Sequence, residues 1–218
     1  MSIRLAVFDC DGTLSDGQAA VCKAMDIAFA EAGLPAPDRH QVRRMVGLSL
    51  PHAIARLAPD AGDETQMIAL QSYKHAFRSA RLDGSLHEPL FDGIEQLLAS
   101  LHGAGWALGV ATGKSDRGLQ STLATHGISG FFSTLQTADR HPSKPHPAML
   151  EQAMADAMAE PRSTVMIGDT VFDVEMAQSA GARAIGVAWG YHEPEELLAA
   201  GAEGVAETAA QLEEMLNG

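Results

Sequence analysis

The sequence has few of the features that suit a protein to an oxidising compartment or to a membrane. Its 218 residues include only two cysteines, Cys10 and Cys22, which are too few and too close for a disulfide framework and are not arranged as a zinc site. No apolar run approaches the roughly 18 residues that span a bilayer. The N-terminus also lacks the order of basic, apolar and small residues that marks an export signal. We therefore expect a cytoplasmic protein.

Positive charge is also scarce. Lysine and arginine number 15 against 28 aspartates and glutamates, which gives a formal net charge of −13. Such a surface repels nucleic-acid phosphates and anionic lipids, and no stretch dense in basic residues opposes this effect. We expect neither a nucleic acid nor a membrane as a partner. Hydrophobic residues make up 46% of the chain, which is enough to form a packed core and excludes wholesale disorder.

Short apolar runs alternate with helical segments along most of the chain. The runs end at turns or polar residues, and they predict strands over 3–8, 106–110, 132–135, 164–167 and 184–187. Helical patterns between them cover 94–101, 119–123, 147–158 and 173–180, and the Ala/Glu-rich C-terminus predicts another helix. This alternation predicts an α/β protein with a doubly wound parallel sheet.

One helical block is too long to be an ordinary connection between two strands. Between Gln18 and about Leu82 apolar residues recur at helical spacing, with breaks at glycine and proline. We expect this block, residues 16–85, to form a helical cap domain. The catalytic core would then consist of residues 1–15 and 86–218.

Polar residues follow several of the predicted strands. Asp9 and Asp11 follow the first strand, Thr112 follows the second, and Asp169 and Asp173 follow the fourth, while Lys144 precedes the third helix; together these six are Asp9, Asp11, Thr112, Lys144, Asp169 and Asp173. Each alone is a common turn or helix-cap residue. In a doubly wound sheet, however, ligands bind outside the carboxyl ends of the strands. The set therefore predicts one site at this edge.

The residue types at that edge suit phosphoryl transfer. Carboxylates from different loops are suitable oxygen ligands for Mg²⁺, and without a cation they would repel one another. Thr112 and Lys144 can supply hydrogen bonds and positive charge to a phosphoryl group. A carboxylate in line with the phosphorus can attack it, and a second carboxyl group two residues on can protonate the leaving oxygen.

The order and spacing of these residues resemble the haloacid dehalogenase superfamily. The resemblance rests on Asp9-Cys10-Asp11-Gly12-Thr13-Leu14-Ser15-Asp16, Thr112, Lys144-Pro145 and Gly168-Asp169-Thr170-Val171-Phe172-Asp173. The helical block is similar to the inserted cap of its phosphoglycolate phosphatase-like branch. The resemblance implies a Mg²⁺-dependent phosphatase that acts on a small phosphorylated metabolite through an aspartyl-phosphate. It leaves open whether the protein is a monomer or a homodimer.

The resemblance also implies a role for each matching residue. Asp9 would be the nucleophile and Asp11 the general acid and base, while Thr112, Gly113 and Lys144 would bind the phosphoryl group. Mg²⁺ would be held by Asp9, the backbone carbonyl of Asp11 and Asp169, with Asp173 as a further or water-mediated ligand. Asp11 argues for a phosphate ester, because the dehalogenases and phosphonate-cleaving members lack an aspartate there. Gly113 departs from the asparagine that is usual in phosphoglycolate phosphatases.

Substrate specificity is less clearly indicated. Arg43 and Arg44 precede a turn that resembles the substrate-facing loop of such caps, and Lys114 opens a helix beside the phosphoryl site. These three cations are candidates for contact with the leaving group, and exposed helix positions are the alternative. Two other functions stay open, a sugar-phosphate phosphomutase and, less favoured, a receiver-like phospho-switch. A receiver accepts phosphate after its third strand, whereas the candidate acceptor here follows the first.

Overall fold

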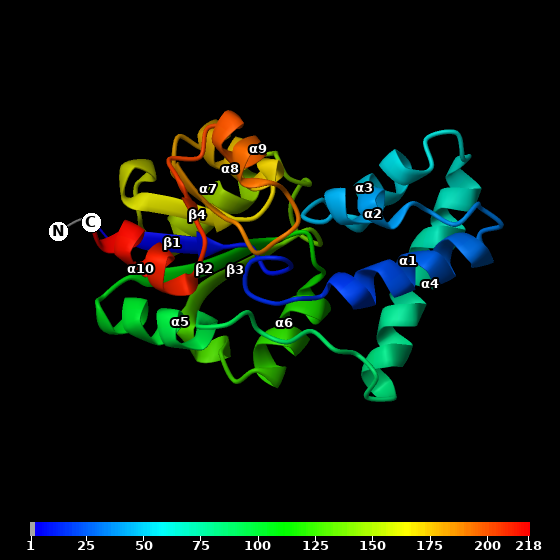
Figure 1. The fold of residues 1–218 in the computed structure, drawn as a ribbon, viewed down its shortest axis with the longest axis horizontal. Coiled ribbons are helices and arrows are strands. Elements are labelled where there is room, and N and C mark those ends of the chain that lie inside the picture. The colour runs from blue at the N-terminus through cyan, green and yellow to red at the C-terminus, as the bar shows by residue number, and fades with distance from the viewer. Residues whose placement is uncertain (1–2) are drawn as a thin grey trace.

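The structure is a computed structural model that describes residues 3–218, and its centre is a six-stranded parallel sheet (Figure 1). The strand order is β3-β2-β1-β4-β5-β6, so that β1 lies between β2 and β4. The strands are β1 Leu5–Phe8, β2 Ala107–Thr112, β3 Phe132–Thr137, β4 Thr164–Gly168, β5 Arg183–Val187 and β6 Val205–Ala206. This confirms the predicted α/β fold class.

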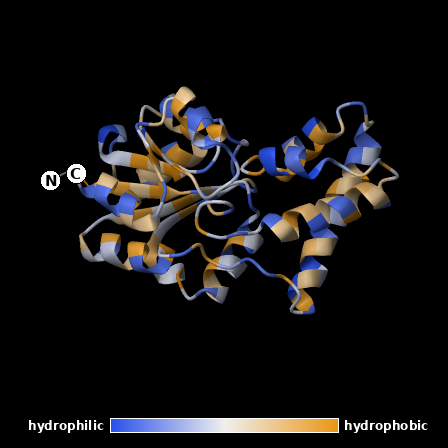
Figure 2. Ribbon diagram, in the orientation of Figure 1, coloured by the Kyte–Doolittle hydropathy of each residue, from blue (hydrophilic) through white to orange (hydrophobic). Residues whose placement is uncertain are grey.

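Helices cover both faces of the sheet. They are α5 Ile94–Gly103, α6 Asp116–Thr125, α7 Ala148–Ala157, α8 Val171–Ser179, α9 Pro194–Ala199 and α10 Ala209–Asn217. Successive side chains of a strand point to opposite faces, and β1 follows this rule. Ala6 and Phe8 pack with α5, α6 and α10, whereas Leu5 and Val7 pack with α7, α8 and α9. In Figure 2 the apolar strands accordingly lie between helices with hydrophilic outer faces.

Two core elements have no counterpart in the sequence prediction. Strand β6 has only two residues at the sheet edge, which is too short to give a recognisable apolar run. Helix α9 has six residues, and its start is marked by Pro194 and by a reciprocal capping box between Glu193 and Glu196. A helix this short has too few turns for a periodic apolar pattern to be seen.

The helical block between β1 and α5 forms a separate lobe beside the sheet (Figure 1). It contains α1 Gln18–Glu31, α2 Arg39–Arg44, α3 Leu50–Leu57 and α4 Asp63–Leu82, which share a hydrophobic cluster of their own. The two connections to the core run side by side, since the Asp16 amide donates to the Pro89 carbonyl at 2.8 Å. Within residues 3–218 no helix is both long and apolar enough to cross a membrane.

Candidate active site

Lys144 lies between two carboxylates at the carboxyl end of the sheet. Its Nζ is 3.0 Å from Asp9 Oδ1 and 2.6 Å from Asp173 Oδ1, and all three side chains are at most 2% exposed. Asp9 directly follows β1, and Asp173 lies in the first turn of α8, where its Oδ2 accepts from the Thr170 hydroxyl at 2.7 Å. Burial alone would lower the pKa of Lys144, but Asp173 and Asp9 outweigh it and hold that pKa above its usual value. The lysine therefore stays charged.

Asp169 completes a cluster of three carboxylates. It accepts the Thr13 hydroxyl at 2.8 Å on Oδ1 and the Tyr191 amide at 2.9 Å on Oδ2. Oxygen atoms of Asp9, Asp169 and Asp173 lie within 4.8 Å of one another. Burial raises the pKa of Asp9 and of Asp169, and the neighbouring carboxylates raise both further, although Lys144 opposes the shift at Asp9.

These acids fit a divalent cation. Their donors are carboxylate oxygens, which Mg²⁺ prefers, and one lysine cannot balance three negative charges. Asp9 Oδ2 is buried and has no hydrogen-bond partner among the described residues, which is costly unless another group binds it. Both oxygens of Asp173 already have hydrogen-bond partners, Lys144 at Oδ1 and Thr170 at Oδ2. Its contact with Lys144 is therefore better defined than a direct contact with the cation.

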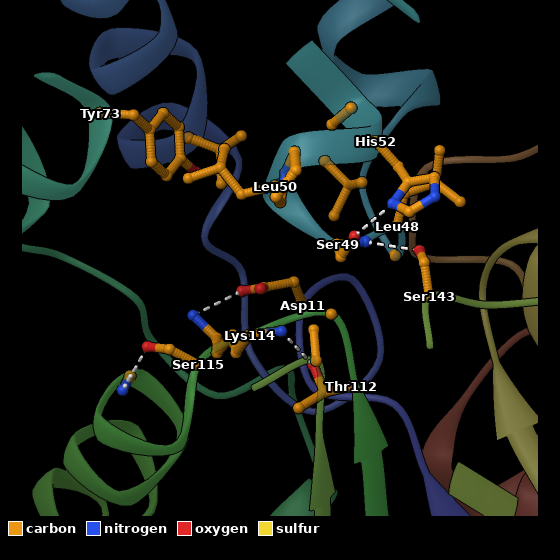
Figure 3. Close-up of a pocket in the computed structure, with 18 of the residues that line it drawn as sticks. Asp11, Leu48, Ser49, Leu50, His52, Tyr73, Thr112, Lys114, Ser115 and Ser143 are labelled. Atoms are coloured by element: carbon orange, nitrogen blue, oxygen red, sulfur yellow. Dashed lines mark hydrogen bonds and ion pairs between the residues drawn. The ribbon is translucent and has the colours of Figure 1, made fainter. Parts of the chain in front are cut away.

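Asp11 has different surroundings from Asp9, although only Cys10 separates them. Asp11 Oδ1 is 2.9 Å from Lys114 Nζ (Figure 3). The same ammonium is also 2.7 Å from Glu88 Oε1. Burial raises the pKa of Asp11, and Lys114 opposes this shift. The Asp11 carboxylate is not part of the three-carboxylate cluster. The Thr112 hydroxyl accepts from the Lys114 amide at 3.2 Å and thereby holds the turn after β2.

A cavity of about 640 Å³ lies above these residues, between the core and the helical lobe. Its core side includes Asp9, Asp11, Thr112, Gly113 and Lys114, and its lobe side includes Val21, Met25, Leu50, Tyr73 and Phe77. Figure 3 shows Tyr73 and Leu50 on one side of the space and Asp11, Thr112 and Lys114 on the other. The lobe also contacts the core directly, because the Ser49 amide donates to the Ser143 hydroxyl at 2.8 Å.

The structure does not bring Arg43 and Arg44 into this cavity. Arg44 forms two hydrogen bonds to Glu196 of α9, at 2.6 and 2.8 Å, and so joins the lobe to the core. Arg43 lines a separate, smaller pocket beside α1. This arrangement corrects the expectation that one of them faces the substrate, because Arg44 is engaged by Glu196, a partner far away in the chain. Of the three specificity candidates only Lys114 lines the main cavity, together with cations of α4 that we did not predict, Lys74, Arg78 and Arg81.

Several other residues contribute to the site although the sequence alone assigns them no role. Thr13 orients Asp169, and its place beside Gly12 in the acidic motif could have drawn attention to it. Glu88 and the loop before α9 show no recognisable sequence motif, because their roles depend on contacts with residues far away in the chain.

In the loop before α9, His192 Nε2 donates to the Arg44 carbonyl at 3.2 Å while Nδ1 accepts from the Val171 amide at 3.3 Å. Burial lowers the pKa of His192, which agrees with one donor and one acceptor nitrogen.

Comparisons with known proteins identify the family to which the chain belongs. The family model described as haloacid dehalogenase-like hydrolase matches residues 6–187. The chain is 36% identical to the "Probable phosphatase IndB" of Dickeya dadantii, over 95% of this chain and 91% of that protein. It is 30% identical to a phosphoglycolate phosphatase of Vibrio vulnificus, over 96% and 94% of the two chains.

A solved structure gives the same result for the fold. The crystal structure of a "predicted phosphatase" from Clostridium acetobutylicum superposes with a TM-score of 0.89 at 26% identity, over 100% of this chain and 99% of that one. The family match covers most of the chain and includes both acidic motifs. The chain therefore belongs to the haloacid dehalogenase-like hydrolase family, as one of its phosphatases.

Proposed function

We propose that the protein hydrolyses a small phosphomonoester in a Mg²⁺-dependent reaction, with the phosphoryl group carried for a time on Asp9. The state of the Asp9 carboxylate supports this most directly. Its Oδ1 is held by Lys144 at 3.0 Å and by the Cys10 amide at 2.6 Å, whereas Oδ2 is buried without a hydrogen bond. Lys144 and the Cys10 amide thus fix the carboxylate beside the cavity, as its attack on an electrophile there requires, and they leave Oδ2 open to a further partner.

The remaining core residues divide the other tasks. Lys144 and Thr112 would bind the oxygens of the phosphoryl group, with Gly113 leaving room beside them. Asp11 would give a proton to the leaving oxygen and later accept one from water, and its raised pKa suits an acid. Asp9, the backbone carbonyl of Asp11 and Asp169 would hold Mg²⁺, with Asp173 as a further or water-mediated ligand, and the ion would supply positive charge for the phosphoryl oxygens when bound.

The helical lobe, residues 16–85, would act as a cap that selects the ester. It closes the cavity from above, and a volume of about 640 Å³ suits a compact metabolite rather than a protein or a polynucleotide. Lys74, Arg78 and Arg81 line this space and form no ion pair with a carboxylate among residues 3–218. Unpaired cations here, in a chain with a net charge of −13, favour an ester that carries a second anionic group.

A substrate panel tests the proposal. Release of inorganic phosphate is measured for phosphorylated metabolites in matched pairs, with a carboxylate or a neutral hydroxyl at the far end of the ester. We expect turnover with Mg²⁺, preference for the anionic member of each pair, and no turnover by the Asp9→Asn variant. Full activity in excess chelator would contradict the metal dependence, and an active Asp9→Asn enzyme would contradict the intermediate.

The contribution of α4 can be separated from that of α2. Replacing Arg78 or Arg81 by alanine should raise KM for the anionic ester by about tenfold or more, since a charged hydrogen bond contributes roughly 1.5–3 kcal/mol. Turnover of p-nitrophenyl phosphate, which has no second anion, should barely change. Arg43→Ala is the matched control, because Arg43 lies outside the cavity. Equal KM values for all three variants would exclude α4 as the anion-binding element.

A further inference from the structure

We infer that Glu88 is a positioning residue for Asp11 and acts on it through Lys114. The inference rests on the proposed function, in which Asp11 protonates the leaving group. Glu88 lies in the segment that returns from α4 to α5, and its side chain is 6% exposed. It is absent from the cavity wall, whereas Asp11 and Lys114 both line it. Any effect of Glu88 on the reaction must therefore pass through its neighbours.

Glu88 is fixed from several sides by the region around α6. Its Oε1 is 2.7 Å from Lys114 Nζ, and its Oε2 accepts from the Thr122 hydroxyl at 3.3 Å. Its backbone carbonyl contacts His126 Nε2 at 2.7 Å. Both the carboxylate and the backbone of Glu88 are thus tied to the core, although the segment that contains it leads out of the helical lobe.

Lys114 is in turn held at both ends. Its amide donates to Thr112, and its ammonium lies between Glu88 and Asp11, at 2.7 and 2.9 Å. A lysine stem has four flexible carbons, and a single acceptor would leave its end free to turn. The second acceptor, Glu88, fixes the ammonium beside Asp11.

The placement of Asp11 matters because proton transfer is sensitive to distance. A general acid must lie about 2.6–3.2 Å from the atom that it protonates, and a misplacement of about 1 Å can cost roughly a hundredfold in rate. Without Glu88, Lys114 could turn toward the phosphoryl oxygens or toward solvent, and Asp11 would lose its fixed partner. The loss would fall on protonation of the leaving group. The attack by Asp9 would not be slowed, because a different lysine, Lys144, positions Asp9.

The test compares two esters in a Glu88→Gln variant. For an alkyl phosphate, which needs a proton on its leaving oxygen, kcat should fall about 10- to 100-fold, within or below the usual range for general acid catalysis. For p-nitrophenyl phosphate, whose leaving group is stable as an anion, kcat should stay within about threefold, and KM should change little for both. Glu95→Gln, on the exposed face of α5, is the control.

A double variant isolates the route through Asp11. Asp11→Asn alone should show the same selective loss on the alkyl ester, and addition of Glu88→Gln should then cause no further loss, because residues that act as one unit are not additive. Thr122→Val removes only one contact of Glu88 and should give a smaller loss with the same preference. The Thr122→Val variant replaces Glu88→Gln in the test if Glu88→Gln does not fold.

Each other outcome overturns the inference. Equal losses on both esters would assign Glu88 to phosphoryl binding, and a loss that follows a lowered Tm would make it purely structural. Unchanged kinetics, or additive losses in the double variant, would mean that Asp11 is placed without it. Failure of the proposed function is distinguishable, because the wild-type protein itself would then release no phosphate from either ester.

Discussion

Gly113 is the position where a single methyl group should separate the helical lobe from the core. It follows Thr112 at the end of β2, opposite the loop that joins α2 and α3. A Cβ atom at Gly113 would lie 2.4 Å from the Leu48 carbonyl oxygen and 2.8 Å from that of Gly47. Both are backbone atoms, which cannot rotate away as a side chain would. In Gly113→Ala the loop must therefore move, or the lobe must shift away from the site.

The expected effect follows from the cost of overpacking. Extra methyl or methylene groups in tightly packed sites typically cost about 1–3 kcal/mol. This cost arises only while the lobe is closed, so it shifts the balance between closed and open states by about 5- to 150-fold. The Ser49–Ser143 hydrogen bond and the Arg44–Glu196 pair oppose the opening of the lobe. The shift between closed and open states should therefore lie toward the lower end of this range. We expect kcat/KM for the preferred ester to fall by about tenfold.

The assay pairs steady-state kinetics with thermal unfolding. Gly130→Ala is the control, because a Cβ there would have no atom within 4 Å. The Tm of Gly113→Ala should change little, since an open lobe avoids the clash without unfolding the core. An unchanged kcat/KM in Gly113→Ala would refute the reasoning, because it would mean that closure over Gly113 is not needed for turnover. Asparagine is the residue usual in phosphoglycolate phosphatases, but Gly113→Asn should lower kcat/KM at least as much as Gly113→Ala does.

Three further outcomes are expected. Mg²⁺ should raise the Tm of the wild-type protein measurably but not that of Asp169→Asn, because ligands stabilise the state that binds them. Chelator should abolish phosphate release, and added Ca²⁺ should restore it poorly, since its coordination is larger and looser. The pKa of Glu196 is lowered to about 2 by Arg44, so the pair stabilises above the ordinary glutamate pKa and weakens as pH falls toward 2. Any Tm difference between Arg44→Ala and wild type, corresponding to about 0–1 kcal/mol for a partly exposed pair, should therefore vanish near pH 2.

The parts of the molecule that depend on local sequence could be predicted. Buried parallel strands need unbroken apolar runs, so β1, β2 and β4 were evident, and parallel strands bring their carboxyl ends to one edge. Asp9, Lys144, Asp169 and Asp173 accordingly meet there. The roles assigned to them stay predictions until turnover is measured.

Contacts between distant segments could not be predicted in this way. Arg44 and Glu196 are 152 residues apart, and nothing in the local pattern of either shows that they meet. The same holds for Glu88, which looks like an ordinary loop glutamate until α6 is placed beside it. The basic face of α4 could have been found as Lys74, Arg78 and Arg81 at helical spacing, but which side of α4 faces the core depends on how the lobe packs.

The two lysines of the site explain how acids only two residues apart can take different roles. Lys144 is paired with Asp9 and Asp173 below the cavity, and Lys114 is paired with Asp11 and Glu88 at its wall. Burial raises the pKa of Cys10 between them, so its thiol stays neutral and adds no charge to either group. Burial and the neighbouring carboxylates raise the pKa of Asp9, but a divalent cation bound among Asp9, Asp169 and Asp173 would favour its ionised form, as the proposed role of nucleophile requires. Asp11 lies outside this cluster, so with a cation bound there it would keep a proton for the leaving group while Asp9 was ionised, which is the division of roles proposed above.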